Sequence, residues 1–187
     1  MSPGAPTVAA LRAAFAAAAW LAATLPLAAQ TTAPEPRLTP PVKPGTFVVG
    51  SLSVAVRTAS DTVRMVPFRY QVDTEYGVRH VCGLRIEREG DAFLLPVVGL
   101  GQTETVSCDA VTDVAAVLRG GRVAHVVMTS VMASPNGAGE GMQIVSLPRS
   151  GHAFVDDDLA LRLMPTGTPN ERKGVLDRLQ RLPDDVR

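Results

Sequence analysis

The chain has 187 residues, with 18 basic and 18 acidic side chains, and therefore no net charge at pH 7 when its histidines are neutral. This balance gives no charge argument for binding to nucleic acid or to an acidic membrane surface. Aromatic residues make up 4% of the chain, which argues against a stacking platform for single-stranded nucleic acid or for sugars.

Residues 1–29 predict an export signal. Arg12 and the amino terminus carry the positive charge of this stretch, and an uncharged run of small and apolar residues follows from Ala13 to Ala29. A short charged start, an apolar stretch and a small-residue exit are typical of a secretory signal peptide, with cleavage after Ala29. The alternative is an uncleaved anchor, since Val8 to Ala29 reaches the length of a membrane-spanning helix. In both alternatives the rest of the chain is exported to the periplasm or the extracellular space. The protein would be attached to a membrane only if the N-terminal segment is retained.

Residues 30–45, QTTAPEPRLTPPVKPG, predict a proline-rich linker. Prolines at this density disfavour helix and sheet and favour an extended polyproline II conformation. The segment is either a disordered leader between signal and domain or a stiff spacer that holds the domain away from a membrane. We favour the leader, because proline-rich leaders need no partner to explain them.

Residues 46–166 predict a β-rich globular domain. Apolar residues alternate with period two in TFVVGSLSVAVR, TVRMVPFRYQV and VRHVCGLRIERE, as in half-buried strands. In the second of these runs the apolar phase changes at Val66–Pro67, which indicates an edge position or a bulge. Further strands are predicted in AFLLPVVGL, RVAHVVMTSVM and MQIVSLP, and FVDDDLALRLM predicts a turn and a last strand. The glycine-rich run from Ser134 to Gly141 predicts a flexible hairpin tip, because it lacks the ending of a phosphate-binding loop.

One internal helix is predicted in DAVTDVAAVLRGG. Asp109 is a suitable N-cap, Val111, Val114 and Leu118 recur at helical spacing, and Gly120 is a suitable stop.

A second, C-terminal amphipathic helix is predicted within residues 167–187. Thr168, Pro169 and Glu171 match a capping box with proline at the first helical position. An apolar stripe follows, and it could dock on the sheet or lie on a partner; its residues are Val175, Leu176, Leu179 and Leu182. The predicted fold class is therefore α+β, mainly β: an antiparallel sheet or sandwich with one internal helix and this C-terminal helix.

The chain contains two cysteines, Cys82 and Cys108, and an even count in an oxidising compartment predicts a disulfide. His80 lies two residues before Cys82 and so on the same strand face. One alternative is a reactive Cys82 thiol with His80 as its base. Another is a zinc site, but His125 and His152 show no ligand spacing. We favour the disulfide with a packed histidine, and we predict no metal and no cofactor.

The most polar cluster lies in LPRSGHAFVDDDLA and contains Ser150, His152, Asp156 and Asp158. These are the residue types of a hydrolase triad, but triads are recognised by spatial geometry and the chain has no G-x-S-x-G elbow. Calcium is a weaker possibility, since the EF-hand spacing is absent. The favoured interpretation is a turn whose aspartates cap it or face water.

Two functional hypotheses follow. The first is a non-enzymatic exported domain of the cell envelope that binds a protein partner, either through an exposed strand edge or through the stripe of the terminal helix. The alternative is a small exported hydrolase that uses Ser150, His152 and Asp156, or the Cys82 thiol with His80. The sequence favours the first, because it shows no coherent catalytic set.

Overall fold

The computed structural model describes residues 43, 45–75, 77–149, 152–164 and 171–183. The predicted signal peptide lies outside these residues, and so does the proline-rich linker apart from Lys43 and Gly45.

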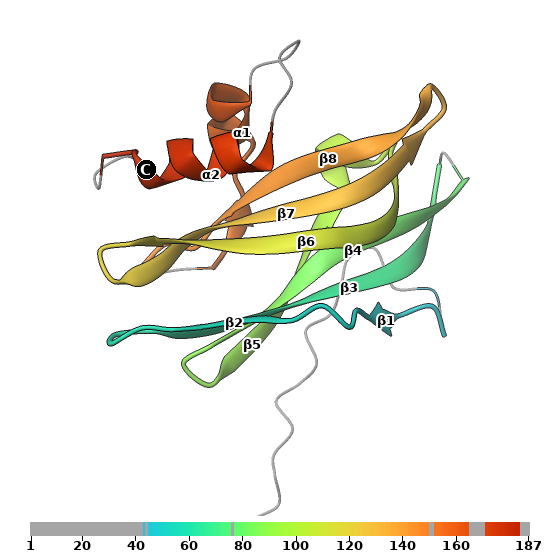
Figure 1. The fold of residues 1–187 in the computed structure, drawn as a ribbon. Helices are drawn as coiled ribbons and strands as arrows, with labels where there is room; N and C mark the ends of the chain where they lie inside the picture. Colours follow the sequence, from blue (N-terminus) through green and yellow to red (C-terminus); the bar gives the residue numbers. More distant parts are fainter. Residues whose placement is uncertain (1–42, 44, 76, 150–151, 165–170, 184–187) are drawn as a thin grey trace, which may run out of the picture. The chain divides into compact units, whose positions relative to one another are not determined.

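The described chain forms two antiparallel sheets and two short helices (Figure 1), which confirms the prediction of a mainly β, α+β fold. Sheet A contains β1 (Val48–Val49), β2 (Val54–Arg57), β3 (Thr62–Thr74), β4 (Gly77–Arg88) and β5 (Asp91–Val98). Its order is β1-β3-β4-β5, and β2 also pairs with β3. Sheet B has the order β6-β7-β8-β9, with bounds Ser107–Arg119, Arg122–Ser134, Gly137–Ser146 and Phe154–Val155. A 3-10 turn, η1 (Gly101–Thr103), lies between the sheets in sequence, and α1 (Asp157–Leu163) and α2 (Arg172–Gln180) follow sheet B.

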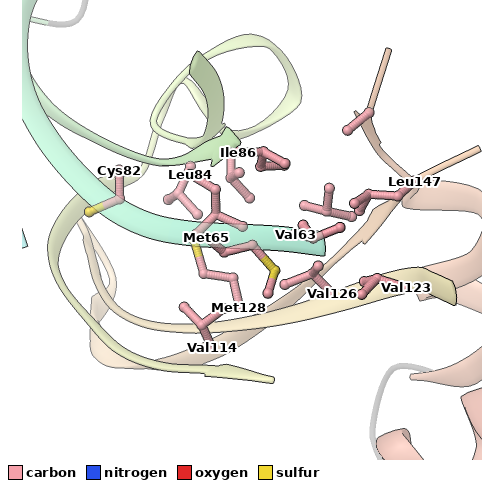
Figure 2. Packing of buried hydrophobic residues seen from close by; sticks show 14 of the residues in the cluster. Val63, Met65, Cys82, Leu84, Ile86, Val114, Val123, Val126, Met128 and Leu147 are labelled. Carbon is pink, nitrogen blue, oxygen red and sulfur yellow. The ribbon is translucent and has the colours of Figure 1, made fainter. Parts of the chain in front are cut away.

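The main core lies between the two sheets (Figure 2). Its centre is formed by fully buried side chains from both sheets: Val63, Met65, Leu84, Ile86, Val126, Met128 and Val145. Each fully buried aliphatic side chain of this kind contributes about 1.5–3 kcal/mol. Within each strand these buried residues are alternate positions, as period-two alternation predicts for side chains on one face of a sheet.

Sheet A is also apolar on its other face. There Phe68, Tyr70 and Val72 pack with Val81, and Phe47 stacks on Phe68 with ring centroids 5.3 Å apart. The phase change predicted at Val66–Pro67 is present without a bulge, because β3 pairs with β4 through Pro67 without a register shift. Val63 and Met65 face the core between the sheets, whereas Phe68, Tyr70 and Val72 pack on the other face of sheet A.

Pro67 occupies a local gap in the neighbouring strand. It lies between the part of β3 that pairs with β1 and the part that pairs with β2. Its carbonyl oxygen accepts a hydrogen bond from the Gly50 backbone at 2.7 Å. The N–H that proline lacks would point to that same side, so the missing donor leaves no ladder bond broken.

The internal helix predicted between Asp109 and Gly120 is wrong, because these residues belong to β6 and its turn. Three register shifts interrupt the pairing of β6 with β7, and each adds a residue to one strand. The shift between Val111 and Asp113 moves Val114 to the core face three positions later, which imitates helical spacing. Gly120 and Gly121, with φ of 54° and 75°, form the hairpin turn that resembled a helix stop.

The last strand predicted in FVDDDLALRLM is shorter than expected, since β9 covers two residues and α1 begins at Asp157. Asp156 is the N-cap of α1, and its Oδ1 accepts the backbone N–H of Leu159 at 3.0 Å. One face of α1 is apolar, with Leu159 and Leu163 buried. Seven residues are too few for sequence periodicity to distinguish a helix from a strand.

The predicted C-terminal helix is present as α2, and its stripe docks on sheet B. Val175 and Leu179 are fully buried and pack in one cluster with Val117, Val127 and Ile144. Figure 1 shows both helices over the face of sheet B that points away from sheet A. Thr168 and Pro169 of the predicted capping box lie outside the described residues, and Glu171 makes no side-chain cap. The stripe is therefore used inside the domain, which removes the support for it as a partner-binding surface.

Across the described part of the chain, no helix combines the length and the apolar character that crossing a membrane requires.

Candidate functional site

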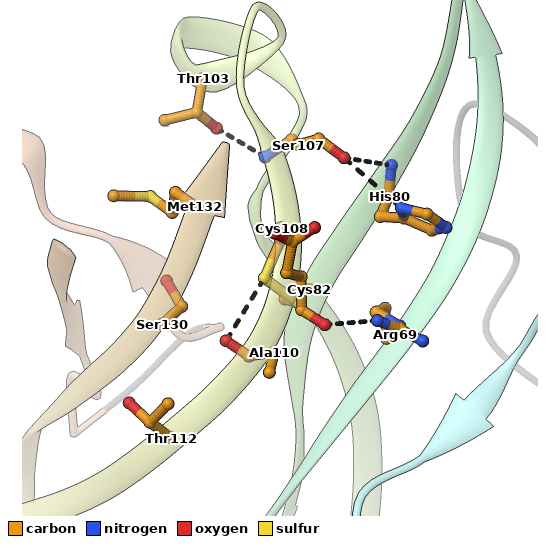
Figure 3. Close-up of a disulfide and its surroundings, with 12 residues drawn as sticks. Arg69, His80, Cys82, Thr103, Ser107, Cys108, Ala110, Thr112, Ser130 and Met132 are labelled. Carbon is orange, nitrogen blue, oxygen red and sulfur yellow. Dashed lines mark hydrogen bonds between the residues drawn. A yellow bond between two sulfur atoms is a disulfide. The ribbon is translucent and has the colours of Figure 1, made fainter. Parts of the chain in front are cut away.

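The two cysteines form the predicted disulfide (Figure 3). Cys82 of β4 and Cys108 of β6 lie with their Cα atoms 5.7 Å apart, and both are fully buried in the core between the sheets. The bond joins one sheet covalently to the other. A cysteine held in a disulfide has no thiolate to act as a nucleophile or a metal ligand. The arrangement therefore supports the interpretation of Cys82 as a structural cross-link.

His80 has hydrogen-bond partners in both sheets. The side-chain amide nitrogen of Gln71 lies 2.7 Å from its Nε2, and its backbone N–H donates to Ser107 Oγ at 3.1 Å. Because an amide nitrogen only donates, Nε2 of His80 accepts this bond. Nδ1 in turn lies 3.5 Å from Ser107 Oγ. The histidine beside the disulfide is thus a packed, hydrogen-bonded residue that links β3 to β6.

Three residues of the predicted polar cluster, His152, Asp156 and Asp158, are described, and no contact between their side chains is found among the described residues. Ser150 lies outside the described residues. His152 is exposed, and its ring packs edge-on against Phe93 with centroids 6.3 Å apart. Asp158 is exposed within the first turn of α1, whereas Asp156 caps that helix. His152 therefore contacts β5 of sheet A, whereas Asp156 contacts β8 of sheet B and α1.

A hydrogen-bonded chain that the sequence did not reveal joins His125, Ser146 and Asp156. His125 Nδ1 lies 3.0 Å from Ser146 Oγ, and that hydroxyl donates to Asp156 Oδ2 at 2.6 Å. A serine nucleophile needs its proton directed at the histidine, with the carboxylate behind the ring. Here the serine lies in the middle and gives its proton to the carboxylate, so the order of the groups suits a structural link. His125 lies opposite Ser146 because β7 pairs with β8 in this register. The sequence does not give the register, so it could not predict this contact.

Burial is the main cause that lowers the pKa of His125, and the positive charge of Arg119 lowers it further. The carboxylate of Asp156 acts in the opposite direction and raises it. The neutral ring is therefore the form that the folded domain favours.

One pocket, of about 290 Å³, lies beside the disulfide at the gap between β1 and β2. Its wall is largely apolar, with Leu52, Pro67 and Val111 among the lining residues. The one basic lining side chain, Arg69, donates from its guanidinium to the backbone oxygen of Asp109. The pocket therefore offers no acid and base in contact with each other. Within the described ranges, no group of three or more histidine, cysteine, aspartate or glutamate residues is arranged to hold a metal ion.

The edges of the two sheets differ in how well they are protected against pairing with another strand. In sheet A, one edge is divided into the short strands β1 and β2, and the other, β5, contains Pro96. In sheet B, β6 carries three register shifts. Short strands, prolines and bulges are the usual devices that prevent edge-to-edge association.

The outer edge of β8 lacks these devices. Its ten-residue pairing with β7 has no register shift, and β9 covers only Val145 and Ser146 of its outer side. We define the β8 edge as the outer side of Gly137–Gln143, for which the described residues provide no strand partner. The glycine-rich run Ser134–Gly141 was predicted to be a hairpin tip, but only residues 135–136 form the turn. Its last five residues, from Gly137 on, belong to β8 and to this edge.

The direction of the free backbone groups follows from one hydrogen bond. The backbone N–H of Asp156 donates to the oxygen of Ile144 at 2.8 Å, so the N–H and C=O of Ile144 point outward from β8. Outward-pointing residues alternate along a strand that has no bulge. Ala138, Glu140 and Met142 therefore present their N–H and C=O groups along the β8 edge, whereas Gly139 and Gly141 direct theirs to β7.

No protein-family model, curated protein or solved structure matches this chain.

We predict that replacing both cysteines, Cys82→Ala with Cys108→Ala, lowers the free energy of unfolding by about 3–4 kcal/mol. The bond closes a loop with a sequence separation of 26 residues, and the loss of this cross-link increases the entropy of the unfolded chain. Urea unfolding of the variant and of the oxidised parent measures the difference. Equal unfolding midpoints would show that the bond is not formed in the protein.

We also predict that acid destabilises the domain partly through His125. Its pKa is lower in the folded state than the ordinary value of 6.5, so the unfolded chain binds the proton first as the pH falls. The free energy of unfolding therefore does not depend on His125 above about pH 6.5. Below that pH it falls as the pH falls, by up to about 1.4 kcal/mol per pH unit. In His125→Gln this part of the pH dependence should disappear from a series of urea unfolding curves. An unchanged slope would contradict the assignment.

Proposed function

We propose that this protein is exported and acts in the cell envelope as a non-enzymatic binding domain, which receives an extended segment of a partner protein along the β8 edge. The observation that carries the proposal is the regular β8 edge, with three outward N–H and C=O pairs, in a domain whose other edges are short, bulged or interrupted by proline. A strand added to such an edge obtains its affinity from main-chain hydrogen bonds.

Export is supported by the N-terminal sequence and by the disulfide. A buried disulfide between the two sheets is compatible with an oxidising compartment such as the periplasm or the extracellular space. The predicted signal peptide, residues 1–29, provides the route.

The composition of the β8 edge suits an extended protein segment. Gly139 carries no side chain and has no atom within 4 Å of the position that a Cβ would occupy, so a bulky side chain of an added strand would meet little steric hindrance beside it. The first four residues of β8, Gly137–Glu140, are exposed, and Glu140 is the single charged residue of the edge. A charge that can be neutralised by a basic residue of the partner adds selectivity at small cost.

The hydrolase alternative has less support. The hydroxyl of Ser146 is directed at a carboxylate, Cys82 is held in a disulfide, and His152 is in contact with Phe93. The triad with Ser150 stays a prediction, since that residue lies outside the described ranges.

We predict that Glu140→Pro prevents partner binding while it leaves the domain folded. The substitution removes an outward N–H that β7 does not use, so the free energy of unfolding should change by less than about 1 kcal/mol. The matched variant Gly141→Pro removes an N–H directed at β7, and its Cβ would lie 1.9 Å from Met132 Cε, so it should destabilise the domain by about 3 kcal/mol or more. Urea unfolding measures both effects.

The partner is identified by a photo-crosslinking amino acid at position 140 in intact cells, with the same amino acid at Arg85 on the opposite sheet as the control. We expect an adduct from position 140 alone, and mass spectrometry then gives the partner segment. A synthetic peptide of that segment should bind the parent and Glu140→Gln, which keeps the backbone N–H, and fail to bind Glu140→Pro. Equal binding to all three proteins, or an adduct with a second copy of this chain, would contradict the proposal.

We predict that the exported protein begins at Gln30. Cleavage after Ala29 removes the apolar segment, and N-terminal sequencing of protein from the envelope fraction detects the new terminus. An envelope protein that retains Met1 would support the anchor alternative. A chain that stays in the cytoplasm would contradict export in both forms.

A further inference from the structure

The pocket beside the disulfide lies where two irregular segments of backbone meet. In sheet A, residues 50–53 connect β1 to β2 outside the ladder with β3, and Gly50 donates its backbone N–H to the oxygen of Pro67. In sheet B, the register shift after Cys108 leaves Asp109 without a partner in the pairing of β6 with β7. Both segments line the same space of about 290 Å³. The pocket therefore follows from the course of the backbone in both sheets.

The positive charge of the pocket comes from Arg69. In the ladder of β3 and β4 this residue is paired with Cys82, so its side chain starts on the same face of sheet A, beside the disulfide (Figure 3). Its guanidinium donates to the backbone oxygen of Asp109. A guanidinium has five N–H donors, and a single neutral acceptor orients it without cancelling its charge. Within the described ranges no ion pair includes Arg69, so both donors and charge are left for a ligand.

Apolar side chains form most of the remaining lining. Leu52 and Val111 line the pocket and also pack against the main core, and Val48, Pro67 and Phe68 extend the same wall. An apolar wall with a small number of placed polar groups is typical of a small-molecule site. Since an apolar cavity of about 150 Å³ holds benzene, a space of about 290 Å³ suits a ligand of roughly ten to twelve non-hydrogen atoms.

Water is a poor occupant for this wall. An ordered water needs about two to four polar partners, and the side chains of Leu52, Pro67 and Val111 provide none. Affinity is gained when an apolar group displaces water that is poorly ordered. The apolar part of a ligand would bind for this reason, whereas Arg69 would bind its polar end through charge-assisted hydrogen bonds.

The acidic residue Asp109 also lines the pocket, and its effect on an anion is opposite to that of Arg69. Asp109 is exposed, whereas Arg69 is half-buried. Water and salt therefore screen the charge of Asp109 more strongly. An anionic ligand is attracted by Arg69 and repelled more weakly by Asp109, so the site favours a single negative charge next to an apolar body.

We propose that this pocket binds a small apolar monocarboxylate, of the chemical class of medium-chain fatty acids. The carboxylate meets the guanidinium of Arg69 in two parallel hydrogen bonds, because the planar fork matches the two carboxylate oxygens. The aliphatic chain lies against Leu52, Pro67 and Val111. The lining residues that the structure describes lie outside the β8 edge, so the test of this site does not depend on the strand-binding proposal.

The experiment is a titration of the purified protein followed by two-dimensional amide NMR. The probes are butanoate, octanoate and dodecanoate, with octanol as the uncharged equivalent of octanoate. We expect saturable shifts that are concentrated at the amides of Gly50 and Ala110, which line the pocket. From butanoate to octanoate the affinity should rise by up to about fourfold for each added CH₂. It should then level off at dodecanoate, because the longer chain extends out of the pocket.

Three variants test the two charges of the pocket separately. Arg69→Met keeps an apolar stem and removes the charge, so the affinity for octanoate should fall about tenfold while octanol binds as before. Arg69→Lys, which keeps the charge and loses the fork, should lie between the parent and Arg69→Met. Asp109→Asn removes the repulsive charge and should tighten octanoate binding about twofold, with no effect on octanol.

Arg85→Met is the matched control, because Arg85 is an exposed arginine of β4 whose side chain is paired with Glu87 at 3.1 Å. It should bind octanoate like the parent. The proposal is overturned if octanoate causes no saturable shift, if octanol binds the parent as tightly as octanoate, or if the affinity still rises at dodecanoate. It is also overturned if Arg69→Met and Arg85→Met bind octanoate equally well. If Arg69→Met loses octanol as well, Asp109→Asn decides: tighter octanoate binding supports the site, and unchanged binding overturns it.

Discussion

The covalent bond between Cys82 and Cys108 is the constraint on which the arrangement of the two sheets depends. It joins β4 to β6 in the interior, where both cysteines are fully buried among aliphatic side chains. The chain is poor in aromatic residues, so its core consists mainly of valine, leucine, isoleucine and methionine. A cross-link that restricts the unfolded chain adds stability without requiring a larger core. The hydrogen bonds of His80 to Gln71 and Ser107 extend the same junction with polar contacts.

The hydrophobic requirements of sheet B explain the position of the helices. Its inner face is covered by sheet A, and its outer face carries Val117, Val127 and Ile144, which would contact water in the absence of the helices. The two short helices cover these residues with Leu159, Leu163, Val175 and Leu179. The chain from Asp156 to α2 is therefore part of the folding unit, and Asp156 connects it to the sheet by accepting from both Ser146 and Leu159.

Much of the fold could be predicted from the sequence, and the failures have physical causes. Period-two alternation located β3, β4 and β7 because these strands keep a regular register over most of their length. It failed for β6, where bulges displace the apolar residues, and for α1, which is too short to show periodicity. The cysteine pair could be predicted by counting. The chain from His125 through Ser146 to Asp156 and the open β8 edge could not, since each depends on which strands pair.

The disulfide also determines how the domain would respond to mechanical load. Lys43 donates its backbone N–H to Gln71, and the chain then continues into β1 and β2 along β3. Tension that entered through Lys43 would therefore break the pairing of β1 with β3 first and then the pairing of β2 with β3. The opening would stop at Cys82, because the covalent bond transmits the force directly to Cys108 and bypasses β5. A domain built in this way could be pulled from its N-terminal side without separating Cys82 of β4 from Cys108 of β6.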